Sequence, residues 1–220
     1  MPDTRPATIR LAGGVVPGVQ RITCAARFND RSSYLSALVT RRSGKPRDLG
    51  DPGPDAEELQ RMLAIAARTP DHGKIAPWRF VTIGTDRREA FADLLARAYL
   101  EANPQAAAHD VESARAFAFQ APALIVVLSA PVRGHKVPVW EQELSAGAAT
   151  MNLLHAAHAL GYAAGWLTGW AAFSETVRAA FGPEGSRIVG FVFIGTPQRP
   201  LEERSRPDPG HLVSDWRGLD

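Results

Sequence analysis

Two short stretches of the chain gather side chains that can hold an anion. In the first, TRRSGK at residues 40–45, two adjacent arginines, a serine and a lysine lie where the chain leaves a predicted helix. Guanidinium groups bind phosphate oxygens in pairs, and a serine hydroxyl can add a third contact, so this stretch could hold a phosphate group. The helix dipole alone also favours basic residues at the end of a helix, and this simpler interpretation stays open.

The second stretch, RTPDHGKIAPWRF at residues 68–80, places Arg68 and His72 between a predicted helix and a predicted strand. Its two prolines limit the freedom of the backbone and would hold both basic side chains ready for a ligand at a low ordering cost. Trp78, which begins the strand, is expected to anchor the loop to the sheet. A rigid proline-bounded corner is the structural alternative, but two basic loops at helix ends together favour a site for a phosphorylated cofactor.

Length and composition limit the classes of protein that this chain can be. With 220 residues, 45% of them apolar, the chain can bury a sizeable core. The 25 basic and 23 acidic residues give a net charge of only +2 and form no basic run, so no nucleic-acid partner is expected. The single cysteine, Cys24, excludes an intrachain disulfide and a multi-cysteine zinc site. We expect a soluble cytoplasmic protein without a membrane partner or a metal site.

The hydrophobic pattern predicts an α+β or α/β architecture of two layers, with about four strands and six helices. The expected helices cover residues 33–43, 55–68, 86–102, 112–120, 140–160 and 174–182, and the expected strands cover 78–84, 123–130, 161–169 and 187–195. Residues 1–32 show no sustained period and are expected to form a poorly ordered extension. A single domain is expected over residues 33–220, including a C-terminal tail.

The predicted helix over residues 140–160 is apolar nearly all round and is expected to end at Gly161, which suits a C-cap. A helix of this kind is expected to be buried on every side. In a domain of this size, that indicates a core element that also faces a second subunit. Glu141 and Glu143 open the helix, where negative charge suits the dipole, and they are interpreted as structural.

The order of four motifs resembles the nitroreductase family, and it is most similar to the short, single-domain bacterial members that bind FMN. The motifs are RRS, then AxRTPDHxxxxPWRF, then HKVPxWEQExSAGAAxMNLLHAAHALGYAAGWLTG, then IVGFVFIGTPQ. Each is weak singly, but in this order they are specific, and the resemblance covers roughly residues 33–200.

The resemblance implies an α+β fold with a mixed sheet flanked by helices, and a homodimer formed across the long central helix with two FMN sites at the interface. It implies an FMN-dependent oxidoreductase that passes hydride from NADH or NADPH to nitroaromatic, quinone or similar acceptors in a ping-pong cycle. The flavin carries the chemistry, so no side-chain acid or base is needed for the first half-reaction. No residue is therefore assigned as catalytic.

The resemblance also implies which residues contact the cofactor. Arg41, Arg42 and Ser43 match the family motif that holds the FMN phosphate and ribityl chain. Arg68 and His72 match a loop that reaches the flavin bound mainly by the other subunit.

Trp166, Leu167 and Thr168 match the segment that runs beside the isoalloxazine ring. Leu167 stands where related members commonly carry an arginine. That departure favours the alternative function, a flavin-binding carrier or sensor without turnover.

Overall fold

The computed structural model describes residues 9–11, 14–16 and 28–216, and the chain divides into two compact units. One unit comprises residues 1–42 and 202–220, and the other comprises residues 43–201. Most of the predicted extension, namely residues 1–8, 12–13 and 17–27, lies outside the described residues. The single domain expected over residues 33–220 stays a prediction.

The larger unit contains a five-stranded sheet in the order β3-β7-β5-β4, with β6 also paired to β7. Each of the pairings among these strands is antiparallel. The strands are β3 (Leu49–Gly50), β4 (Trp78–Thr82), β5 (Ala123–Ser129), β6 (Ala163–Leu167) and β7 (Arg187–Pro197). Four of them were predicted, whereas the two residues of β3 are too few to show a hydrophobic period.

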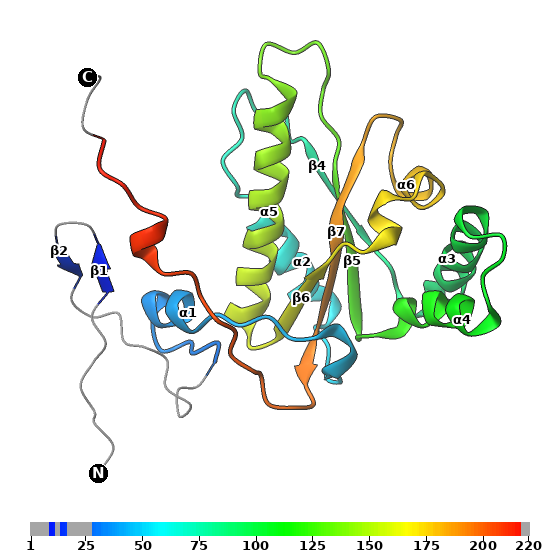
Figure 1. The fold of residues 1–220 in the computed structure, drawn as a ribbon, viewed down its shortest axis with the longest axis horizontal. Coiled ribbons are helices and arrows are strands. Elements are labelled where there is room, and N and C mark those ends of the chain that lie inside the picture. Colours follow the sequence, from blue (N-terminus) through cyan, green and yellow to red (C-terminus); the bar gives the residue numbers. More distant parts are fainter. Residues whose placement is uncertain (1–8, 12–13, 17–27, 217–220) are drawn as a thin grey trace. The chain divides into compact units, whose positions relative to one another are not determined.

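Helices cover both faces of this sheet (Figure 1). Along β5, alternate side chains point to opposite faces, so Leu124 and Val126 pack in one core cluster while Ile125 and Val127 pack in another. One face is covered by α2 (Ala56–Ala66) and α5 (Val139–Leu160), and the other by α3 (Arg88–Ala102) and α6 (Glu175–Phe181). Helix α4 (Ala108–Ala116) packs against α3. The predicted α+β class is confirmed.

Local capping explains where the helices begin and end. Asp55 accepts a hydrogen bond from the Glu58 backbone N–H, and the Glu58 carboxylate accepts one from the Asp55 N–H, so α2 begins with a complete capping box. By contrast, α4 begins four residues before its predicted start. No side chain caps this helix, so the sequence carries no signal for its first residue. At the end of α5, Gly161 adopts a left-handed conformation with φ of 101°, as predicted.

Helix α5 is not buried on every side within one chain, so the complete burial expected from the sequence depends on the predicted second subunit. Trp140 and Leu144 are 69% and 54% exposed, and Ala148 lies one turn further along the same face. We call these three residues the α5 stripe. An apolar row of this kind is what the predicted contact with a second subunit requires, and the dimer itself stays a prediction.

The smaller unit contains an antiparallel hairpin of β1 (Ile9–Leu11) and β2 (Gly14–Val16), the helix α1 (Tyr34–Thr40) and the short helix η5 (Pro209–His211). Helix α1 ends three residues earlier than predicted, because the backbone leaves the helical conformation at Arg41. Asn29 and Asp30, which belong to the predicted extension, bond to the backbone of Arg42 and the hydroxyl of Thr40. The poor order expected of residues 1–32 stays a prediction.

Candidate functional site

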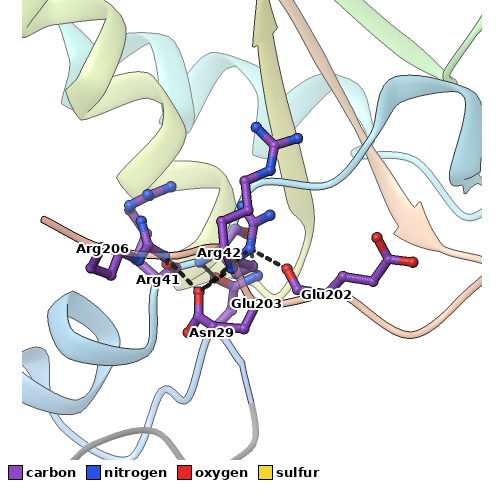
Figure 2. A network of polar contacts seen from close by, with 7 residues as sticks. Asn29, Arg41, Arg42, Glu202, Glu203 and Arg206 are labelled. Carbon is purple, nitrogen blue, oxygen red and sulfur yellow. Dashed lines mark hydrogen bonds and ion pairs between the residues drawn. The ribbon is translucent and has the colours of Figure 1, made fainter.

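In the smaller unit, the end of α1 meets the residues that follow Leu201 in a network of charged groups (Figure 2). Asn29 holds the backbone of Arg42 on both sides, accepting from its N–H at 2.8 Å and donating to its carbonyl at 3.1 Å. The Arg42 Nε donates to the carbonyl oxygen of Glu202 and lies 3.8 Å from the Glu203 carboxylate. Arg206 lies 3.1 Å from the same carboxylate oxygen, so Glu203 bridges two guanidinium groups.

Four arginines share this region, and we call Arg41, Arg42, Arg204 and Arg206 the arginine cluster. Burial lowers the pKa of Arg42 below its ordinary value, and the charges of Arg204 and Arg206 lower it further, while Glu203 partly opposes them. For Arg41, burial is again the main cause of a lowered pKa, followed by the charge of Arg206.

The mutual repulsion of these arginines means that a bound anion would be favoured in the cluster. A phosphate monoester carries about −1.5 to −2 charges and three strong acceptor oxygens, which suits several guanidinium groups. The chemistry of this donor set therefore fits the FMN phosphate. Arg204 and Arg206 were not predicted, because they lie about 160 residues from Arg42 in the chain. The only local signal was two arginines in a Pro- and Arg-rich tail.

Ser43 begins the larger unit, where the chain crosses strand β6. The N–H of Gly44 donates to the carbonyl of Ala164 at 3.1 Å. The crossing is so close that a Cβ on Gly165 would lie 2.6 Å from the Gly44 carbonyl oxygen. Ser43 is thus positioned beside the strand that also carries Trp166.

The predicted flavin-side residues lie at the end of β6 and just beyond it. The indole N–H of Trp166 donates to the Val189 carbonyl at 3.0 Å, and a Cβ on Gly190 would lie only 2.1 Å from the indole nitrogen. Glycine at position 190 is therefore needed for this placement of the indole. Leu167 is partly buried and Thr168 is exposed.

The loop over residues 68–77 is braced from within. The Asp71 carboxylate accepts from the N–H of Ala76 at 2.7 Å, and the Asp71 carbonyl accepts from the N–H of Lys74 at 3.2 Å. Lys74 and Ala76 both have positive φ, a conformation that is unusual for residues with a Cβ. Trp78, 7% exposed, packs with Ala146 and Ala149 of α5, and its role in anchoring the loop stays a prediction.

The same loop is fastened to α5 by three side chains of the helix. Glu141 Oε1 lies 2.7 Å from His72 Nδ1, and the Ser145 hydroxyl donates to the Pro70 carbonyl at 2.7 Å. Further along, the Asn152 amide donates to the Thr69 hydroxyl at 2.7 Å. The sequence interpretation missed the contact of Glu141, which lies 69 residues from its partner.

A pocket of ≈ 310 Å³ lies between the loop and α5, and His72 is one of its walls. Its lining residues are Thr69, Pro70, Asp71, His72, Pro77, Val137, Glu141, Gln142, Leu144, Ser145 and Ala148. The structure therefore brings His72 together with Glu141 in this pocket. Arg68 and residues 166–168 are not part of its wall.

Among the residues that the structure describes, no group of three or more His, Cys, Asp or Glu side chains could hold a metal ion. No helix among those residues is long and apolar enough to cross a membrane.

The sequence of this chain is similar to those of nitroreductases. A model of the nitroreductase family matches residues 38–196. The Escherichia coli K12 protein named "Putative NAD(P)H nitroreductase YdjA" is 39% identical over 182 residues, which is 82% of this chain and 97% of that protein.

Two solved structures share the fold at low sequence identity. A nitroreductase-like family protein from Bacillus cereus superposes with a TM-score of 0.72 at 22% identity, covering 85% of this chain and 97% of the other. A nitroreductase with bound FMN from Bacteroides fragilis NCTC 9343 gives a TM-score of 0.59 at 21% identity, covering 79% and 94%.

Proposed function

Because the chain belongs to the nitroreductase family of oxidoreductases, we propose that it binds FMN and transfers hydride from NADH or NADPH to a nitroaromatic, quinone or similar acceptor. The arginine cluster is the observation that carries this proposal, because it offers several guanidinium groups to one dianionic phosphate. When bound, FMN would supply the hydride chemistry. The donor leaves before the acceptor enters, in a ping-pong cycle.

We assign the phosphate to Arg41, Arg42 and Ser43, as the family motif implies, and add Arg204 and Arg206 from the arginine cluster. The guanidinium groups would bind phosphate oxygens in pairs, and the serine hydroxyl would donate one further hydrogen bond. Their task is to hold and orient the cofactor, since the chain contributes no assigned acid or base.

On the flavin side, we assign Trp166, Leu167 and Thr168 to the isoalloxazine ring, and Arg68 and His72 to the flavin held mainly by the other subunit. The apolar parts of this segment would exclude water from the ring, and the loop would contribute polar contacts at its edge. The rigid bracing of the loop supports this role, because a preformed wall lowers the ordering cost of binding.

The proposed homodimer would bury the α5 stripe. Its exposed Trp140 and Leu144 form an apolar surface of the kind that marks an interaction site. Leu144→Glu is expected to give a monomer in light scattering, whereas Leu100→Glu, at a 42% exposed leucine of α3, is expected to leave the oligomeric state unchanged. Equal behaviour of the two variants would contradict this interface.

The cofactor assignment can be tested on the purified protein. A yellow preparation that releases FMN on denaturation is expected, with a flavin spectrum that bleaches when NADH or NADPH is added. Arg42→Ala is expected to weaken FMN binding by about 1.5–3 kcal/mol, the range of a hydrogen bond to a charged group. A protein without affinity for FMN would contradict the proposal.

The rate of NADH or NADPH oxidation in the presence of a quinone or a nitroarene distinguishes an enzyme from a flavin-binding carrier or sensor without turnover. Leu167 is the residue that favours the carrier or sensor. A bound flavin that neither nucleotide reduces would support the carrier. Leu167→Arg would then show whether this side chain is the cause.

Sharing of the site between chains has its own test. A dimer of one Arg42→Ala chain and one His72→Ala chain is expected to retain about half of its flavin. Near-complete loss, given that each variant alone loses flavin, would show that both residues serve the site of their own chain.

A further inference from the structure

We infer that Glu141 is a positioning residue for His72: it holds the imidazole in one tautomer, whose Nε2 accepts a hydrogen bond from an amide or imide N–H of the ligand. This inference rests on the proposed function, which supplies two ligands with such a group. One is the imide of the flavin ring, and the other is the carboxamide of the nicotinamide.

The tautomer follows from the chemistry of the contact. Glu141 Oε1 lies 2.7 Å from His72 Nδ1, which is the distance of a charge-assisted hydrogen bond. An ionised carboxylate can only accept, so Nδ1 must carry the hydrogen. In the neutral ring, Nε2 then has a lone pair and acts as an acceptor.

The position of the ring follows from the way α5 holds the loop. Glu141 and Ser145 are one helical turn apart and so share a face of α5, where they bond to His72 and to Pro70 respectively. Asn152 continues this attachment further along the helix by bonding to Thr69. The loop is thus fixed to α5 at three residues, namely Thr69, Pro70 and His72. Of these, His72 has a second polar ring atom, Nε2, that can contact a ligand.

Stability does not explain the contact between Glu141 and His72. Their side chains are 39% and 63% exposed, and ion pairs at such sites contribute only about 0–1 kcal/mol. The same hydrogen bond has a larger effect on orientation, because it selects one ring tautomer and limits rotation about the side-chain torsions.

In the wall of the pocket, Nε2 of His72 is the polar ring atom that a ligand can contact. The other polar side chains in its wall already bond to the protein. Thr69 donates to the Ala66 carbonyl, Ser145 donates to the Pro70 carbonyl, the Asp71 carboxylate accepts from the Ala76 N–H, and buried Gln142 bonds to the backbone of Val132 and Val137. Prolines, a valine, a leucine and an alanine complete the wall, which suits a flat ring bearing an N–H group.

The test compares Glu141→Leu, which removes the acceptor, with Glu141→Gln, which keeps an acceptor oxygen. Glu143→Leu is the matched control, because Glu143 lies on the same helix and its carboxylate is 4.0 Å from Arg187 rather than near His72. The tautomer of His72 is read from its ring ¹⁵N shifts at pH values high enough that they no longer change. The spectrum of His72→Asn assigns the signals among the six histidines.

We expect the wild type and Glu143→Leu to show His72 with hydrogen on Nδ1, Glu141→Leu to show a mixture of tautomers, and Glu141→Gln to restore the wild-type state in part. Binding of the ligand is expected to weaken about five- to tenfold in Glu141→Leu, the effect of one hydrogen bond. A weaker FMN affinity of the apoprotein would identify the flavin imide as the donor. A raised KM for NADH or NADPH at unchanged kcat and FMN affinity would identify the nicotinamide carboxamide.

A wild-type tautomer in Glu141→Leu would overturn the positioning role. A changed tautomer with unchanged FMN affinity and unchanged KM would overturn the ligand contact. The ¹⁵N measurement needs no cofactor, so a protein that does not bind FMN would refute the proposed function while the pairing of Glu141 with His72 is still tested.

Discussion

Replacing Arg88 by methionine is expected to destabilise the larger unit by about 3–5 kcal/mol. Arg88 is only 4% exposed, and its guanidinium donates to three backbone carbonyls. The acceptors are Ile83 at 3.1 Å, Ala118 at 2.5 Å and Pro122 at 3.0 Å. Ile83 follows β4, and Ala118 and Pro122 precede β5, so one side chain joins the segments that flank these two paired strands.

The magnitude follows from the three backbone carbonyls that lose their hydrogen-bond donor in the variant. A hydrogen bond to a charged group contributes about 1.5–3 kcal/mol, so three independent bonds would sum to roughly 5–9 kcal/mol. Bonds that share one donor group are not additive, which reduces the sum. The wild-type protein also spends free energy on burying the charge of Arg88, as the lowering of its pKa by burial indicates. The variant avoids this cost, which further reduces the expected destabilisation. Methionine keeps most of the side-chain volume, so little of the effect comes from a cavity.

The measurement is urea-induced unfolding followed by circular dichroism and tryptophan fluorescence. Arg87→Met is the matched control, because the neighbouring arginine has a side chain that is 77% exposed and pairs only with an exposed aspartate. Its effect is expected to stay within about 0.5 kcal/mol. If the two variants unfold at the same urea concentration, the carbonyl contacts of Arg88 do not stabilise the fold and the reasoning is refuted.

Two other predictions concern charge. Glu203→Gln removes the carboxylate that competes for Arg42, so FMN and inorganic phosphate are expected to bind about three- to tenfold more tightly, as titration would show. Asp208→Asn, which removes an equal charge from the same segment, is expected to change little, and an equal gain in both would argue against a specific contact. The hydrogen bond that Tyr162 donates to Glu58 raises the pKa of Tyr162 to about 12, above its unfolded value of about 10. Its contribution to stability is therefore complete below pH 10 and lost as the pH rises to about 12, and Tyr162→Phe is expected to lack that loss in denaturant unfolding measured across this range.

The sequence alone determined most of the secondary structure, because each signal acts between neighbours in the chain. Asp55 and Glu58 mark the start of α2, and Gly161 marks the end of α5. The apolar run over residues 123–129 reads as a fully buried strand, which it is. The order of the motifs also identified the family, since it needs only residue types and spacing.

Which distant residues meet depends on how the helices pack on the sheet. The register of β5 against β7 sets the frame, and α5 packs on one face of that sheet, so Glu141 comes to lie beside a loop that precedes it by 69 residues. Within the smaller unit, Glu203 and Arg206 likewise lie beside Arg42 and Arg41 at the end of α1, although about 160 residues separate them in the chain. Local patterns cannot encode such contacts, because the free energy that selects them comes from burial and pairing across the whole core.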